Sequence, residues 1–161
     1  MLVRNAMELA GLAGLVIPGG ESTTLLKLLA HNDLFDRLRG FAAEKPVFGT
    51  CAGCILLARS ILPMPQPSLG MLDIAVVRNA YGRQIDSHVA SAVSRLPGPE
   101  LEMMFIRAPR IVEASPQVEV LAEHAGSPAL VRQGHTLAAT FHPELSADRR
   151  VQQLFVSMLG G

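Results

Sequence analysis

One short segment limits the possible folds more than any other: the apolar run at residues 46–50 (PVFGT) leads directly through Cys51 into an apolar helical stretch at residues 52–58. A short apolar run bounded by turn residues is typical of a strand that is buried on both faces. The sequence therefore predicts a strand, a sharp turn and a helix in immediate succession. Strands buried on both faces belong to parallel sheets that helices cover from either side.

A second apolar run, residues 13–17 (AGLVI), ends in residues 18–20 (PGG) and predicts another buried strand that feeds a tight turn. Ser22 or Thr23 is expected to cap the helix that follows. Apolar side chains at helical spacing then predict two helices, with Leu25, Leu28 and Leu29 in the first and Leu34, Phe35, Leu38, Phe41 and Ala42 in the second. These helices form the crossover between the two strands.

The second half of the chain consists mostly of strand-like runs, after a proline-rich loop that follows Ser60. Strands are expected at residues 72–77, 88–93, 104–106, 118–121, 129–132 and 137–141. Residues 147–159 close the chain as a helix. The order of elements predicts one α/β domain over residues 1–161, with a doubly wound, mostly parallel sheet and an antiparallel extension.

Charge and composition exclude several classes of function. The 14 basic side chains balance the 14 acidic ones, which gives no electrostatic footprint for nucleic acid or an anionic membrane. A small neutral or zwitterionic substrate fits this balance better. Two cysteines are too few for a disulfide framework, and no apolar run approaches the roughly 18 residues of a membrane-spanning helix. Without a secretory type of leader, the expected compartment is the reducing cytosol.

Cys51 has the surroundings of a nucleophile elbow. The turn between strand and helix forces the nucleophile into a strained backbone conformation, so its neighbours must be small, and Gly49 and Gly53 meet that demand. The start of a helix lowers the pKa of a thiol, and the free amides of Ala52 and Gly53 can hold an oxyanion. The alternative is a buried structural cysteine, since cysteine is among the most buried residue types.

A candidate base follows the last predicted strand. His142 comes directly after residues 137–141, and Glu144 lies two positions further on, with Pro143 limiting the backbone between them. The carboxylate can therefore reach the imidazole and fix its tautomer, which is the logic of a catalytic triad. A structural histidine at a strand end is the alternative for this feature taken by itself.

The turn at residues 18–20 lies at the carboxyl end of its strand, on the same side of a parallel sheet as Cys51. Gly19 and Gly20 let the backbone approach a ligand, and Glu21 could neutralise a substrate ammonium group. The simpler alternative is a glycine turn followed by a helix cap.

Cys51 and Cys54 also form a C-x-x-C, the spacing of thioredoxin-like redox sites. A redox function leaves His142 and Glu144 unexplained, and Cys54 can serve as core packing inside the helix. The remaining histidines show no pairing that indicates a metal site and are expected to be surface or structural residues: His31, His88, His124 and His135.

Five motifs occur in the order found in one group of amidotransferases: GLVIPGGESTT, PVFGTCAG, VRNAYGRQ, MFIRAPRI and TFHPEL. From about residue 2 to residue 159, the chain closely resembles the glutaminase subunit of pyridoxal 5'-phosphate synthase, the PdxT/SNO family of class I glutamine amidotransferases. The resemblance implies hydrolysis of L-glutamine to glutamate and ammonia through a thioester. It also implies delivery of the ammonia to a barrel-shaped synthase subunit, without any cofactor or metal.

The resemblance also assigns residues. It implies a triad of Cys51, His142 and Glu144, and an oxyanion hole made by the backbone amides of Gly20 and Ala52. It implies that glutamine is bound by Gly19, Glu21, Ser22, Arg78, Ile106 and Arg107. In this family the glutaminase is poorly active until its synthase partner is present.

One departure from the family and two alternatives accompany this resemblance. Family members usually begin with a further strand, a glutamine-bearing loop and a helix, and their absence here predicts a gap in the sheet beside the strand that leads to Cys51. One alternative is a DJ-1/PfpI-like cysteine protein, but such proteins commonly have histidine where Ala52 stands. The other is a truncated, non-catalytic subunit that still docks on its partner.

Overall fold

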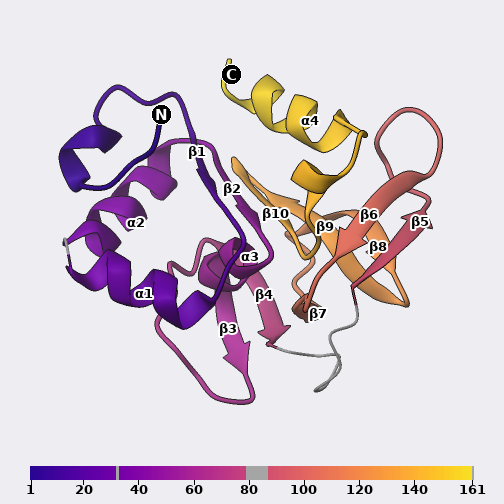
Figure 1. The fold of residues 1–161 in the computed structure, drawn as a ribbon, viewed down its shortest axis with the longest axis horizontal. Helices are drawn as coiled ribbons and strands as arrows, with labels where there is room; N and C mark the ends of the chain where they lie inside the picture. The colour runs from indigo at the N-terminus through magenta and orange to yellow at the C-terminus, as the bar shows by residue number, and fades with distance from the viewer. Residues whose placement is uncertain (32, 79–86, 161) are drawn as a thin grey trace.

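The structure is a computed structural model that describes residues 1–31, 33–78 and 87–160 (Figure 1). The helical elements are η1 (Ala6–Leu9), α1 (Ser22–His31), α2 (Leu34–Glu44), α3 (Ala52–Leu57), η2 (Pro143–Leu145) and α4 (Arg150–Met158). The strands are β1 (Leu15–Ile17), β2 (Val47–Thr50), β3 (Ala58–Leu62), β4 (Leu72–Val77), β5 (His88–Ala92), β6 (Leu101–Phe105), β7 (Arg110–Ala114), β8 (Glu119–His124), β9 (Ser127–Gln133) and β10 (Thr136–Ala139).

The largest sheet has the strand order β1-β2-β10-β9-β8. The pairs β1-β2 and β2-β10 are parallel, whereas β9 and β8 continue the sheet in antiparallel fashion. A parallel core with an antiparallel extension is therefore confirmed. Two smaller sheets, β3-β4-β7 and β5-β6, stand beside it, and both contain antiparallel pairs.

Helices cover both faces of the parallel strands. Successive side chains on a strand point to opposite faces, so neighbouring residues of one strand pack against different helices. Val47 and Ala138 belong to a core cluster that includes residues of α2 and α3. Phe48 and Leu137, their neighbours in sequence, belong to a second cluster, to which α4 contributes Phe155. Figure 1 accordingly shows α1 and α2 on one side of β1 and β2, and α4 on the other.

Several predicted element boundaries were wrong. The helix predicted at 52–58 ends at Leu57 and passes straight into β3, and neither β3 nor β7 was expected. The predicted strand at 104–106 is shifted, since β6 covers Leu101–Phe105. The last helix begins at Arg150, three residues later than predicted. In the part of the chain that the structure describes, no helix is both long and apolar enough to cross a membrane.

The predicted gap beside the strand that leads to Cys51 is also wrong. That strand, β2, pairs with β1 along one edge and with β10 along the other. Phe48, for example, has Val16 as its partner on one side and Leu137 on the other.

Candidate active site

Cys51 lies between β2 and α3 with φ 49° and ψ −105°, a backbone conformation that L-residues rarely adopt. The predicted elbow is therefore present. Its two glycines are required by close packing: a Cβ atom on Gly53 would lie 2.1 Å from the carbonyl oxygen of Ile17, and one on Gly49 would lie 2.6 Å from the backbone of Gly53. They allow α3 to press against β1 and β2, which fixes the position of the nucleophile.

Cys51 and Cys54 have very different surroundings. The Cys51 side chain is buried, with its Sγ atom 4.0 Å from the carbonyl oxygen of Ile106. Cys54 is fully buried inside α3, where burial and the neighbouring Cys51 raise the pKa of its thiol to about 12. Both cysteines are free. Because thiol exchange requires a thiolate, a protonated Cys54 argues against the redox alternative.

His142 and Glu144 meet as their spacing predicted. The Nδ1 atom of His142 lies 2.7 Å from Oε1 of Glu144. His142 directly precedes the short helix η2, and Glu144 is the second residue of that helix. The imidazole is 13% exposed and the carboxylate 50% exposed. The backbone amide of His142 donates to the carbonyl oxygen of Met104 at 2.8 Å, which ties this loop to β6.

His142 also reaches the cysteine. A hydrogen bond with the Cys51 side chain is the main reason that the pKa of His142 rises to about 9; burial lowers this pKa, and the hydrogen bond with Glu144 raises it further. An imidazole of raised pKa favours a thiolate–imidazolium pair, which is the reactive form of a catalytic cysteine. The arrangement thus brings together a candidate nucleophile, a candidate base and a carboxylate that can orient the base.

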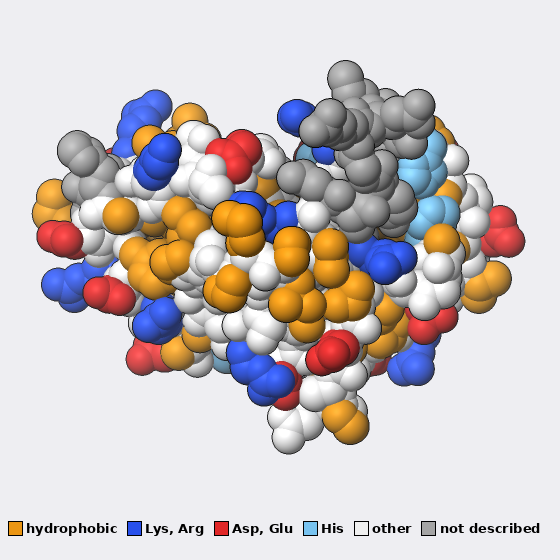
Figure 2. All heavy atoms as spheres, turned by 90° about the horizontal axis from the view of Figure 1, so that it is seen from below, with side chains coloured by type: hydrophobic (Ala, Val, Ile, Leu, Met, Phe, Trp, Pro, Cys, Tyr) orange, Lys and Arg blue, Asp and Glu red, His pale blue; other side chains and the backbone are white. Residues whose placement is uncertain are grey.

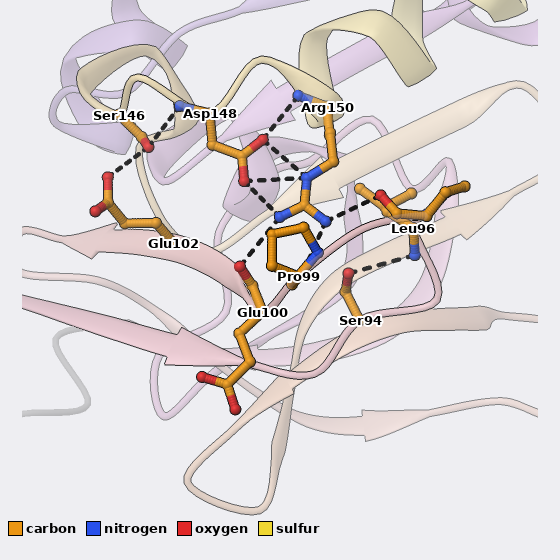
Figure 3. Close-up of polar contacts among 9 residues, drawn as sticks. Ser94, Leu96, Pro99, Glu100, Glu102, Ser146, Asp148 and Arg150 are labelled. Atoms are coloured by element: carbon orange, nitrogen blue, oxygen red, sulfur yellow. Dashed lines mark hydrogen bonds and ion pairs between the residues drawn. The ribbon is translucent and has the colours of Figure 1, made fainter.

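The segment that follows Glu144, from Ser146 to Arg150, is anchored by polar contacts (Figure 3). Ser146 donates to Oε1 of Glu102 in β6 at 2.6 Å and accepts from the backbone amide of Asp148. Asp148 in turn pairs with Arg150, whose guanidinium donates to the carbonyl oxygens of Pro97, Pro99 and Glu100 in the connection between β5 and β6. These contacts fix the loop between β10 and α4.

The glycine turn lies against both reactive side chains. A Cβ atom on Gly19 would be 2.5 Å from Cε1 of His142 and 3.4 Å from Cβ of Cys51. Gly20 has φ +140°, a conformation that favours glycine. The structure therefore brings the Gly19–Gly20 backbone to the same edge of the sheet as Cys51, as predicted.

The contacts of Glu21 favour a role in capping a helix over a role in binding a substrate ammonium group. Its carboxylate accepts hydrogen bonds from the backbone amides and the hydroxyl groups of Thr23 and Thr24, at the start of α1. The Thr23 hydroxyl, followed by that of Thr24, lowers the pKa of Glu21 to about 2. The expected cap, Ser22 or Thr23, is thus corrected: Glu21 caps α1. An ammonium-binding role for Glu21 stays a prediction.

Ser22 and Arg78 are hydrogen-bonded to each other and to Gln66, a residue that the sequence did not predict to be part of the site. Arg78 Nη1 donates to Oε1 of Gln66 at 2.6 Å and to Oγ of Ser22 at 3.4 Å. Ser22 Oγ donates to the same Gln66 oxygen at 3.4 Å. Gln66 lies in the proline-rich loop and follows no periodic pattern, so nothing in the sequence marked it. The rest of the VRNAYGRQ motif, residues 79–84, lies outside the described residues.

Ile106 and Arg107 follow β6 directly. The carbonyl oxygen of Ile106 faces Cys51 Sγ, and Arg107 has φ 44°, in the left-handed region, with an exposed side chain. The structure therefore places the backbone carbonyl of Ile106 beside Cys51, while the Arg107 side chain is exposed.

Three of the other histidines have structural contacts. His88 and His124 stack on Phe105 with their Nε2 atoms 3.2 Å apart, and burial, followed by His88, lowers the pKa of His124. Figure 2 shows histidine side chains gathered at one end of the face that it views. His135 Nε2 lies 3.0 Å from the carbonyl oxygen of Ala42.

Comparisons with known proteins identify the family of the chain. A model described as the SNO glutamine amidotransferase family matches residues 1–160. A protein of Koribacter versatilis (strain Ellin345), named pyridoxal 5'-phosphate synthase subunit PdxT, is 55% identical over 159 residues, covering 99% of this chain and 82% of the relative. A protein of the same name from Solibacter usitatus (strain Ellin6076) is 50% identical over 165 residues, covering 99% and 86%.

Solved structures agree with this assignment. A crystal structure described as glutamine amidotransferase matches with a TM-score of 0.90 at 43% identity, and the match covers 99% of this chain and 85% of that one. A glutamine amidotransferase from Thermotoga maritima shares the fold, with a TM-score of 0.53 at 16% identity over 90% of this chain and 64% of that one. The chain therefore belongs to the SNO glutamine amidotransferase family.

Proposed function

We propose that this chain hydrolyses L-glutamine to glutamate and ammonia and supplies the ammonia to a pyridoxal 5'-phosphate synthase subunit in the cytosol. The observation that carries the proposal is the contact of His142 with both Cys51 and Glu144, with Cys51 on a strained elbow. The relatives named as pyridoxal 5'-phosphate synthase subunits support the choice of partner. Residues 1–161 act as one domain, in which two core clusters share the central sheet.

The chemistry follows from the roles of these groups. The Cys51 thiolate attacks the side-chain amide carbon of glutamine, and the backbone amides of Gly20 and Ala52 stabilise the oxyanion that forms. His142, held by Glu144, protonates the departing ammonia and leaves a γ-glutamyl thioester. His142 then takes a proton from water, whose oxygen attacks the thioester and releases glutamate. All proton transfers use one imidazole.

The remaining residues of the predicted site bind the substrate. Arg78 and Ser22 bind the α-carboxylate, because a guanidinium and a hydroxyl are suitable donors for that group. Gly19 and Ile106 line the site beside Cys51 with backbone atoms, and Arg107 extends its rim. Glu21 receives the substrate ammonium group after its carboxylate turns away from the start of α1.

The test is ammonia release from glutamine, measured with and without the synthase subunit of a relative of this family. Cys51→Ser is expected to abolish release, while Cys54→Ser, a matched change three residues away inside α3, keeps most of it. Equal loss from both changes would favour the redox alternative. If the unchanged chain binds the synthase but releases no ammonia in its presence, it only docks on its partner, and the proposed activity is wrong. The barrel-shaped form of the partner is part of the same proposal.

A further inference from the structure

Gln66 joins two residues of the proposed glutamine site. It lies in the loop from β3 to β4, which runs along the lower edge of Figure 1. Its Oε1 atom accepts hydrogen bonds from Arg78 at 2.6 Å and from Ser22 at 3.4 Å. Ser22 is 3% exposed, and Gln66 and Arg78 are half-buried, so the contact is partly shielded from solvent.

The chemistry of the contact fixes the orientation of the Gln66 amide. A guanidinium is a donor only, so the amide must present its oxygen, and not its nitrogen, to Arg78. The Nε2 atom is buried and, among the described residues, has no hydrogen-bond partner. The Gln66 side chain is thus held by packing around its amide, and its carbonyl oxygen fixes the Nη1 end of the Arg78 guanidinium.

An amide oxygen holds the arginine without cancelling its charge. A carboxylate at this position would form an ion pair with Arg78 and compete with any anionic ligand, whereas a neutral acceptor leaves a full positive charge. Among the described residues, the side-chain hydrogen bonds of Arg78 both come from Nη1, and the guanidinium fork has further donors for a second planar acceptor.

We propose that Gln66 is a positioning residue that holds Arg78 and Ser22 in the geometry that binds the α-carboxylate of glutamine, and that its neutrality is required for this binding. The proposal rests on the proposed function, because it assigns Arg78 to the substrate carboxylate. Gln66 acts through Arg78 and takes no part in the chemistry at Cys51.

The experiment compares three variants in the complex with the synthase. Gln66→Leu removes the acceptor, and Gln66→Glu keeps the acceptor but neutralises Arg78. Gln133→Leu is the matched control, because Gln133 Oε1 accepts from the backbone amide of Asp73 and contacts neither Ser22 nor Arg78 in the structure. The KM for glutamine is expected to rise about tenfold to a hundredfold in Gln66→Leu and at least as much in Gln66→Glu, with kcat changed less than about threefold, as for loss of a charge-assisted contact.

A second substrate separates positioning from a general structural role. With 4-aminobutanamide, which is glutamine without its α-carboxylate, the unchanged chain and Gln66→Glu are expected to have kcat/KM values within about threefold of each other, since neither can use Arg78 for this substrate. If Gln66 had a purely structural role, Gln66→Glu would be more active toward glutamine than Gln66→Leu, because its carboxylate still holds Arg78 through an ion pair. This result would overturn the inference.

Direct binding distinguishes failure of the inference from failure of the proposed function. Calorimetric titration of glutamine into Cys51→Ala, and into the same variant with Gln66→Glu, measures affinity without turnover. Weaker binding in the double variant supports the inference. Equal binding overturns it and leaves the proposed function intact. If neither protein binds glutamine and the unchanged chain does not hydrolyse it in the complex, both proposals are wrong.

Discussion

At the scale of single residues, His142 is placed between a thiol and a carboxylate that both favour its protonated form. The hydrogen bond with Cys51 raises the pKa of His142 most, burial opposes this, and Glu144 adds to the rise, so that the pKa reaches about 9. The imidazole of His142 is therefore expected to be protonated at neutral pH and to lose this proton as the pH rises through about 9.

Glu144→Gln tests this electrostatic arrangement. The change removes the carboxylate that raises the pKa of His142, so the basic limb of the pH profile of kcat/KM is expected to move from near pH 9 to lower pH. Activity should fall by about 10-fold to 10⁴-fold, less than for His142→Asn, because orienting residues of a triad contribute less than the base. Glutaminase assays of the complex between pH 6 and pH 10 provide the measurement. An unchanged basic limb would show that Glu144 does not act on His142.

The same residue couples folding stability to pH. Because the pKa of His142 is raised from 6.5 to about 9 in the folded chain, its contribution is fully present below pH 6.5 and is lost as the pH rises toward 9. The difference in free energy of unfolding between the unchanged chain and His142→Asn should therefore shrink over this interval. Urea unfolding at pH 6, 7.5 and 9 tests the prediction, and a difference that grows with pH would contradict it.

The sequence predicted the proximity of the proposed reacting groups better than it predicted the contacts that position the proposed binding residues. Cys51, His142 and Glu144 belong to short motifs with fixed local geometry, so their meeting could be expected. Gln66 could not be found, since its contacts depend on a loop that bends back to a residue 44 positions earlier in the chain. The carboxylate of Glu21 is engaged by hydroxyl groups two and three positions away.

At the scale of elements, the position of α3 depends on the absence of side chains. Gly53 lets the helix lie against the carbonyl oxygen of Ile17 in β1, and Gly49 lets it lie against β2. The elbow and the glycine turn after β1 are thus held together by backbone contacts, which deform less easily than contacts between flexible side chains.

Gly53→Ala is expected to destabilise the fold, and Gly40→Ala is its control. A Cβ atom on Gly53 would meet backbone at 2.1 Å, whereas one on Gly40, in the exposed part of α2, meets nothing within 4 Å. Overpacking costs about 1–3 kcal/mol or more. In Gly40→Ala, by contrast, the higher helix propensity of alanine is expected to stabilise the chain by up to about 1 kcal/mol. Chemical denaturation of both variants should give changes of opposite sign, and equal stability of Gly53→Ala and the unchanged chain would contradict this packing.

The elements that the sequence missed are those defined by distant partners. The strand β3 has the burial pattern of a partly exposed segment, without strict alternation, and it follows α3 with no intervening turn. It is a strand because it pairs with β4, which in turn pairs with β7 about 40 residues further along the chain. Local periodicity does not report such pairings, whereas the apolar runs of β2 and β10 were evident.

At the scale of the whole molecule, the candidate site is assembled from the carboxyl ends of several strands. Cys51 follows β2, His142 follows β10, the glycine turn follows β1, and Ile106 follows β6 in a different sheet. The relative placement of the sheets therefore affects the geometry around the nucleophile. A partner that binds across this edge could improve the alignment of the site without contributing a residue to it.

We expect a glutamine-directed electrophile to label Cys51, and not Cys54, and to do so faster when the synthase is bound. Cys54 is excluded by its burial and by its raised thiol pKa. The acceleration is expected because docking can set the conformation of the Gly19–Gly20 turn, which carries one amide of the proposed oxyanion hole. Mass spectrometry of the labelled chain gives both the site and the rate. A rate that does not change with the synthase would remove this gating while leaving the glutaminase proposal in place.

The close packing around the elbow also has a consequence for divergence among related chains. A lineage that descends from this sequence can exchange Cys54 for another small apolar residue with little effect, because that position only fills the core of α3. It cannot vary positions 19, 49 and 53 in the same way, since each faces backbone or a reactive side chain at less than contact distance. Glycine is expected to persist at these positions for as long as the fold does, including in descendants that have lost Cys51.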